Sequence, residues 1–413
     1  MRRILSLICF LSISLFVPAQ DHDHHEEHSE AHANECGHVE ESHDFNPGNT
    51  AFHHIGDQNV FSIGPFQLPL PCILYAPEEG WSVFSSGKFD ADGHGVGRKA
   101  YAGYVLFEGM VKKVVEPAGF SKEMVELGDH KVYEKEEATA DGKSKKVIYV
   151  CYNGQEWRTD NLSTADAGVF GGGITSFYDF SLTKNVVSML LVVLFLGWVF
   201  IGMANKYRRT EGQAPSGLQG FMEPMIVFIR DEVAIPFLGH KWEKFLPFLL
   251  SLFFFILGLN LFGQIPFLGN ANVTGNLAVT MVLAVLAFLV TNLNGNKHYW
   301  EHIFWMPGVP AWVKTILTPV EFLGLFIKPI TLMLRLFANI TAGHMVMVIF
   351  VGLIFVFGRS GESVGGSLGT AVGSTLLTVF MMAIELLVAF IQAFVFTILT
   401  ASYIGAATED AHH

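Results

Sequence analysis

Charged residues are scarce in this chain of 413 residues: only 15% are Asp, Glu, Lys or Arg, while 51% are apolar. Soluble proteins carry about a quarter of charged residues, so this deficit argues against a purely soluble protein. Positive charge is especially sparse, with a formal net charge of −12 and no Lys or Arg between Arg3 and Lys88. Such a balance gives no electrostatic support to a nucleic-acid partner. The chain also lacks a phosphate-binding loop, so we do not expect it to bind ATP. We expect no cofactor either.

The first 20 residues have the parts of a secretory signal. Arg2 and Arg3 provide positive charge, residues 4–16 are apolar, and residues 18–20 (PAQ) offer a small-residue cleavage site. The apolar stretch is too short to cross a bilayer comfortably. We therefore predict that residues 1–20 are a signal peptide and that the segment after them is exported.

Residues 21–44 form a tail that is rich in histidine and acidic residues, with nine Asp or Glu and seven His. Imidazole and carboxylate ligands suit zinc, copper or nickel, but a defined site needs fixed geometry and this spacing is irregular. Two interpretations stay open: a disordered, solvated acidic tail, or a weak metal or proton buffer. The weak candidates for metal ligands are His22, His24, His25 and His28.

Residues 45–158 have an ordinary composition and predict a small exported domain that is β-rich or α+β. Short β-prone runs, such as 60–63 (VFSI) and 145–151 (KKVIYVC), are separated by Gly and Asp-Gly turns. Residues 159–180, which include many Gly, Asp, Ser and Thr, are expected to be a linker.

The cysteines of the exported part are read as candidates for oxidation, because disulfides form outside the cytoplasm. Cys72 and Cys151 lie in the expected domain and are the pair we expect to bond, which leaves Cys36 of the tail unpaired.

Residues 181–413 predict an all-α polytopic membrane domain, since no charged side chain occurs from Phe245 to Asn296. Five membrane-crossing helices are expected, at residues 185–205, 245–265, 273–294, 312–358 and 369–407. The last two are longer than a bilayer is thick and must therefore tilt steeply or bend. An amphipathic segment, residues 218–236, is expected as a surface helix on the cytoplasmic side.

Basic residues set the expected orientation of the helices. Lys206, Arg208 and Arg209 follow the first span directly, which marks the cytoplasmic side by the positive-inside rule. An exported N-terminal region agrees with this, and five crossings place the C-terminus in the cytoplasm. The expected location is the inner membrane of a bacterium.

Ionisable residues inside the last two spans are the strongest functional signal, because charge within a membrane is costly. Glu321, Lys328 and Arg335 are spaced seven apart, so they share one helix face, and Asn339 joins them four residues later. In the last span, Glu385 and Gln392 are also seven apart and share a face.

His344 lies nine residues after Arg335, on the opposite side of the helix and about 13 Å along it. If the last two spans pair antiparallel with Arg335 level with Gln392, His344 comes level with Glu385. A His–Glu pair in a wet cleft is a good proton relay, because imidazole titrates near neutrality. Arg335 stays protonated, so the pattern predicts a fixed cation with a titratable pair leading to it from outside.

Structural interpretations stand beside these functional ones. Asn339 and Gln392 also suit interhelical hydrogen bonds in a scaffold. Lys328 and Glu321 also suit an ordinary ion pair or snorkelling near the cytoplasmic end. A further set of polar residues suits either an aqueous entry from outside or turn capping: Asn260, Asn272 and Asn276.

Residues 328–344 (KPITLMLRLFANITAGH) resemble the signature of subunit a of the F-type ATP synthase membrane sector. Glu385, which stands six residues before the run 392–396 (QAFVF), and residues 244–266 resemble further parts of that family. The resemblance covers about residues 178–413. The first 170 residues depart from it, because the family's usual N-terminus is much shorter.

The resemblance implies a non-catalytic, proton-translocating stator subunit. In the family, the helix that bears the essential Arg packs against the rotating ring of c subunits, and Arg335 matches that position. Asn339 and Gln392 match its polar neighbours, and His344 and Glu385 match the relay positions. The implied partners are the c-ring, the peripheral-stalk b subunit, the whole ATP synthase and membrane lipid. Whether protons or sodium ions are carried stays open, because the selecting carboxylate is on the ring.

Two other functions were weighed. A metal-handling secondary transporter would use the His-rich tail as a metal collector, but it would need inverted repeats or intramembrane ligand clusters that the sequence lacks. A pure assembly scaffold has no need of Arg335, His344 and Glu385 within one membrane region.

Overall fold

The computed structural model describes Cys36 and most of the chain from residue 56 to residue 409. The described ranges are 56–160, apart from 64–65, 78, 93–94, 116–119, 121–122, 129–130 and 139–143, and then 176–209, 213–265, 271–306, 310–357 and 364–409. The predicted signal peptide and the four weak metal-ligand candidates of the tail lie outside the described residues.

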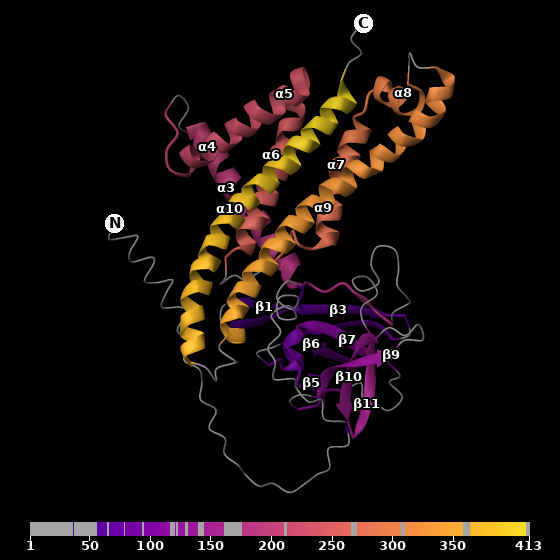
Figure 1. The fold of residues 1–413 in the computed structure, drawn as a ribbon, viewed down its shortest axis with the longest axis vertical. Coiled ribbons are helices and arrows are strands. Elements are labelled where there is room, and N and C mark those ends of the chain that lie inside the picture. The colour runs from indigo at the N-terminus through magenta and orange to yellow at the C-terminus, as the bar shows by residue number, and fades with distance from the viewer. Residues whose placement is uncertain are drawn as a thin grey trace. The chain divides into compact units, whose positions relative to one another are not determined.

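The N-terminal domain is built from antiparallel strands, which confirms the β-rich prediction (Figure 1). A five-stranded sheet has the order β6 (Tyr104–Phe107), β7 (Met110–Val114), β11 (Gln155–Asp160), β10 (Ser144–Tyr152), β9 (Val132–Ala138). A three-stranded sheet has the order β12 (Tyr178–Asp179), β3 (Pro71–Ala76), β4 (Gly80–Ser85). Two strand pairs complete the domain: β1 (Val60–Ile63) with β2 (Phe66–Pro69), and β5 (Lys99–Ala100) with β8 (Val125–Glu126).

Local sequence explains how these strands turn and pack. Asn153 and Gly154 connect β10 to β11 with φ values of 51° and 75°. A two-residue hairpin of this kind needs left-handed backbone at both positions, which Asn and Gly adopt most readily. Alternate residues of the strands then bury apolar side chains, among them Leu74, Leu106 and Val150, which are all 0% exposed.

The expected disulfide between Cys72 and Cys151 is wrong. Cys72 is a free cysteine, 0% exposed, within the apolar cluster beneath the three-stranded sheet. Cys151 and Cys36 are the cysteines that are disulfide-bonded. The physical reason is that Cys72 and Cys151 belong to different sheets, and Cys72 points into a core where it acts as a small apolar side chain.

The expected linker is shorter than residues 159–180. Asp160 still belongs to β11, and Tyr178 and Asp179 form β12, paired with Tyr75 and Leu74 of β3. A strand of two residues is too short to show an alternating pattern in the sequence. The Gly-rich residues before it therefore indicate a linker that extends to residue 180. Residues 161–175 lie outside the part of the chain that the structure describes.

The rest of the chain is helical. The helices are α3 (Lys184–Arg209), α4 (Leu218–Ile229), α5 (Ile235–Leu238), α6 (Trp242–Gly263), α7 (Leu277–Leu293), α8 (Lys297–Trp305), α9 (Ala311–Phe357) and α10 (Val364–Thr408). Two long antiparallel helices, α9 and α10, run side by side (Figure 1). With 47 residues, α9 is about 70 Å long, even though it contains Pro319 and Pro329.

Within the described residues, four helical runs are long and apolar enough to cross a membrane: Lys184–Arg209, Leu218–Gly263, Trp312–Ile354 and Thr370–Thr408. The pair α7 and α8 passes the same test as one span bent by 103°, which raises the number to five. This agrees with the five predicted crossings. In the run Leu218–Gly263, Gly239 separates α5 from α6 with a φ of 51°, a left-handed conformation that favours glycine.

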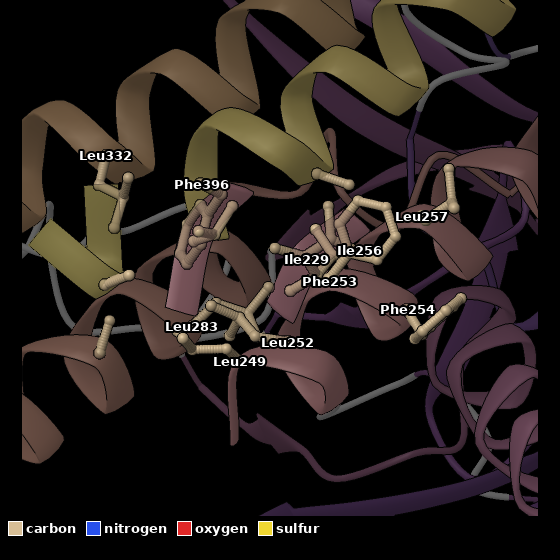
Figure 2. Packing of buried hydrophobic residues seen from close by; sticks show 14 of the residues in the cluster. Ile229, Leu249, Leu252, Phe253, Phe254, Ile256, Leu257, Leu283, Leu332 and Phe396 are labelled. Carbon is tan, nitrogen blue, oxygen red and sulfur yellow. The ribbon is translucent and has the colours of Figure 1, made fainter. Parts of the chain in front are cut away.

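One apolar core joins the helices (Figure 2). Phe253 and Ile256 of α6, Leu283 of α7, Leu332 of α9 and Phe396 of α10 all contribute to it. Helices in lipid associate mainly through close van der Waals packing, so this interlocked core holds the bundle together. Glycines permit the closest approaches: a Cβ on Gly405 of α10 would lie against the backbone oxygen of Phe237 in α5.

The predicted amphipathic segment is helical and has two different faces. Ile229, Val233 and Ala234 are 0% exposed and belong to the core. Arg230 and Asp231 are exposed and form an ion pair at 2.7 Å. A π-helical turn over Arg230–Ala234 joins α4 to α5 here.

Candidate functional site

His344 of α9 and Glu385 of α10 form a buried pair between the two long helices. His344 Nε2 lies 3.6 Å from Glu385 Oε1, and the two side chains are 6% and 4% exposed. This is the proximity that the spacing along the two antiparallel helices predicts. Neither carboxylate oxygen of Glu385 accepts a hydrogen bond from a described residue. A buried carboxylate with so little compensation does not stabilise a bundle, and such groups cluster at functional sites.

Small residues make room for this pair. A Cβ on Gly343, directly before the histidine, would lie 3.1 Å from Glu385 Oε1. A Cβ on Gly263, at the end of α6, would lie 3.8 Å from His344 Nε2 and 2.7 Å from the backbone oxygen of Ala271. The imidazole therefore lies close to the end of α6 as well as to α10.

Three asparagines that were expected to line an entry or to cap turns divide between two structural roles. Asn272 Oδ1 accepts a hydrogen bond from Gly275 N at 3.0 Å, and Asn276 caps α7 by accepting one from Ala278 N at 2.9 Å. Asn260 instead is buried in α6, donates to Ala389 O at 3.3 Å and accepts from Thr274 Oγ1 at 2.7 Å. Asn260 and Thr274 thus place polar groups on the residues that pack against the helix of Glu385.

Lys184, the first residue of α3, is a buried charge to which sequence reasoning gave no role. It is 3% exposed, and its positive charge acts on His344 and on Asp57 of the N-terminal domain. Asp57 Oδ1 accepts hydrogen bonds from Gln58 N at 3.0 Å and Asn185 N at 3.1 Å. Desolvation raises the pKa of the Asp57 carboxyl. In the sequence, Lys184 resembles an ordinary charge flanking a span, and Asp57 is 127 positions away.

Arg335 lies on an exposed face of α9, unlike the buried pair. Asn339 is exposed on the same face. The neighbouring positions on this face carry small side chains that are also exposed: Thr331, Ala338 and Ala342. Small residues let a second helix approach closely, so this face suits helix packing around a fixed cation.

Gln392 is buried in α10, only 7% exposed. The resemblance makes Gln392 a polar neighbour of Arg335, but no hydrogen bond joins the two within the described part of the chain. The charge of Arg335 acts on Tyr403 of α10, which lies about three turns beyond Gln392.

Lys328 and Glu321 lie toward the opposite end of α9 from His344. The Lys328 ammonium lies 5.6 Å from the centre of the Tyr403 ring, and a pocket there is lined also by Asn292 and Tyr299. Tyr299 donates a hydrogen bond to Asn292 Oδ1 at 3.2 Å, and the charge of Glu321 acts on Tyr299. Polar groups therefore gather at this second location, apart from the His344–Glu385 pair.

No group of three or more His, Cys, Asp or Glu side chains that could hold a metal ion occurs among the described residues. The predicted weak ligands of the tail lie outside those residues and are not tested by this.

Comparisons with known proteins divide the chain in two. Residues 186–405 match a family described as ATP synthase A chain. Residues 50–142 match a separate family described only as a domain of unknown function. The membrane part and the β-rich part of the fold thus correspond to different families.

Individual relatives match the membrane part. The chain is 41% identical over 242 residues to ATP synthase subunit a of Chloroherpeton thalassium, which covers 57% of this chain and 69% of that protein. It is 39% identical over 243 residues to ATP synthase subunit a of Myxococcus xanthus, covering 57% of this chain and 75% of that one.

Proposed function

Because the chain belongs to the ATP synthase subunit a family, we propose that it is the stator subunit that passes protons to and from the c-ring of the ATP synthase membrane sector. The observation that carries the proposal is the arrangement on α9. Arg335 is exposed on a face of small side chains, while His344, nine residues further, is buried against Glu385. A scaffold has no use for a cation on one side of a membrane helix and a titratable pair on the other.

Arg335 acts on the carboxylate of each passing rotor subunit. A carboxylate that faces lipid must be neutral, because a bare charge there is too costly. Beside the guanidinium of Arg335, the ionised form is favoured, so the proton leaves. Because Arg335 itself never gives up its proton at physiological pH, it also stops protons from passing directly between the two sides.

The outer half-channel uses His344 and Glu385. Asn260 and Thr274 supply polar groups near the helix of Glu385. An imidazole beside a carboxylate exchanges protons readily near neutral pH. The small side chains at Gly343 and Gly263 leave space for this exchange.

The inner half-channel opens near Glu321 and Lys328. The pocket that Lys328 shares with Asn292, Tyr299 and Tyr403 is the polar feature that supports this location. Each proton that descends a potential of 100 mV between the two openings releases about 2.3 kcal/mol, which turns the ring.

The proposed orientation follows from α3. Its last turn carries Lys206, Arg208 and Arg209, which favours a cytoplasmic end. The N-terminal domain then lies outside the inner membrane, the C-terminus lies in the cytoplasm, and the peripheral-stalk b subunit completes the stator.

The test is ATP-driven proton pumping by the complete ATP synthase carrying Arg335→Ala. We expect normal insertion and assembly but no pumping, because the rotor carboxylate no longer meets a cation. Arg230→Ala is the matched control, since Arg230 is exposed on the π-helical turn and forms an ion pair with the exposed Asp231 beside it. Pumping by Arg335→Ala at the control rate contradicts the proposed role.

A further inference from the structure

The three-stranded sheet carries large apolar side chains on both of its faces. This is unusual, because an antiparallel sheet with one face on the core commonly has polar side chains on the other face. Its inner side is the buried core that includes Leu74 and Phe84. Cross-strand partners share a face, and the pairs Ile73↔Val83 and Tyr75↔Trp81 lie on the outer side. We call the outer set the aromatic face: Ile73, Tyr75, Trp81, Val83, Tyr178 and Phe180.

The aromatic face is continuous and open. Trp81, Val83 and Phe180 are 62%, 68% and 57% exposed. The ring centres of Tyr75 and Trp81 are 5.0 Å apart, and those of Trp81 and Phe180 are 5.6 Å apart. A contiguous apolar patch on a folded domain marks a surface that is covered by something other than water.

The neighbouring sheet shows what a water-facing surface looks like in this same domain. There, most of the exposed side chains of β9, β10 and β11 are charged, and several of them pair across strands. The pairs are Lys135–Glu156 at 2.6 Å, Lys146–Glu134 at 2.8 Å and Arg158–Glu137 at 3.5 Å. The strands of the three-stranded sheet place no charged side chain on the aromatic face.

The aromatic face is fastened to the end of the first membrane span. Phe180 N donates to Ile73 O at 2.8 Å, and Leu182 N donates to Pro71 O at 3.2 Å. Lys184 then begins α3, only four residues after Phe180. Exposed apolar side chains begin again on the span at Leu190, which is 49% exposed, and include Leu194 at 69% and Trp198 at 71%.

We propose that the aromatic face inserts into the interfacial layer of the lipid bilayer on the side where α3 begins. Trp and Tyr rings favour this layer, because one end of each ring is apolar and the other bonds to water or headgroups. The short, hydrogen-bonded connection to α3, a helix able to span a membrane with exposed apolar side chains, is what selects lipid over a protein partner. The domain is then seated on the membrane by an uncharged surface and needs no anionic lipid.

The experiment places the full-length chain in nanodiscs of phosphatidylethanolamine and phosphatidylglycerol whose acyl chains carry bromine close to the headgroup. The fluorescence of Trp81 is obtained as the difference between the natural chain and Trp81→Phe. We expect this component to be quenched by the brominated lipid and protected from acrylamide in the water. Trp157 of β11, obtained in the same way from Trp157→Phe, is the control and should not respond to the brominated lipid.

A second variant tests the surface itself. Val83→Glu places a carboxylate on the exposed aromatic face, where it does not disturb the core. This carboxylate should keep the face out of the lipid, so that acrylamide quenches the fluorescence of Trp81. Gln155→Glu, at an exposed position of β11, should leave Trp81 protected. Trp81 that is quenched by acrylamide and not by brominated lipid in the natural chain overturns the proposal. Protection of Trp81 only in the complete ATP synthase also overturns it, because the cover is then a protein.

Discussion

The imidazole Nε2 of His344 lies 3.6 Å from the carboxylate Oε1 of Glu385, with both side chains buried between α9 and α10. The distance is longer than a hydrogen bond, so the two groups are close neighbours that exchange a proton only after a small movement of either side chain. Arg335, in contrast, is exposed on α9. This arrangement suits a proton path that runs through the buried His344–Glu385 pair and ends at the accessible cation of Arg335.

Glu385→Gln should slow proton flux through the membrane sector on the order of 100-fold, because a positioned proton-transfer group typically contributes that much. The measurement is passive proton flux in proteoliposomes after the catalytic head has been removed. Glu232→Gln, at an exposed position of the π-helical turn, is the control and should conduct normally. An unchanged flux and pH profile in Glu385→Gln would remove this residue from the path.

Gly405→Ala should lower the free energy of unfolding by about 1–3 kcal/mol, the usual cost of overpacking. Its new Cβ meets the backbone oxygen of Phe237, which cannot rotate away as a side chain can. Gly373→Ala is the control on the same helix, since its Cβ meets nothing within 4 Å. Thermal unfolding of the reconstituted chain compares them, and equal midpoints would argue against the close contact of α5 and α10.

Asp57→Asn should flatten the pH dependence of stability above pH 3.8. Burial raises the pKa of Asp57 above its ordinary value of 3.8, so the folded state holds this proton more tightly than the unfolded chain does. Stability therefore falls as the pH rises from 3.8 through the raised pKa, and the neutral amide removes this fall. The measurement is the unfolding midpoint of the full chain as a function of pH.

Glu156→Gln serves as the control of opposite sign for that experiment. Hydrogen bonds from Lys135 and Tyr133 lower the pKa of Glu156 below its ordinary value of 4.5. Its stabilising effect is present above that pH and is lost as the pH falls through the lowered pKa. Identical pH profiles for the two variants would contradict both assignments.

Cys72 should resist alkylation in the folded, oxidised chain. Burial raises the pKa of its thiol to about 12, and the thiolate is the reactive form. Mass spectrometry after treatment with N-ethylmaleimide should find Cys72 unmodified before denaturation and modified after it, with Cys36 and Cys151 oxidised throughout. Labelling of Cys72 in the folded chain, or a disulfide on it, would be the opposite result.

The arrangement of α9 and α10 could be predicted because helices are periodic. Spacings of seven and nine residues fix the face and height of a side chain, and antiparallel pairing then brings His344 to Glu385. The same arithmetic could not reveal the electrostatic interaction of Lys184 with Asp57, since it joins two elements far apart in sequence. No local pattern marks either residue as a partner of the other.

The strands show the same limit. The run 145–151 was evident from its β-branched and aromatic residues, and it lies within β10. The partner of Cys151 was mistaken because sequence alone does not say which sheet a cysteine's strand joins. Tyr178 and Asp179 were assigned to a linker because β12 exists only through its pairing with β3.

Hydrogen bonds hold the chain on both sides of the junction before α3. Tyr178 pairs with β3. Gln58 O accepts a hydrogen bond from Lys184 N, and Asp57 Oδ1 accepts one from Asn185 N. The N-terminal domain is therefore joined to α3 by hydrogen bonds as well as by the continuous chain. If the chain is the stator subunit that we propose, a force on its helices would reach that domain through these hydrogen bonds as well as through the backbone.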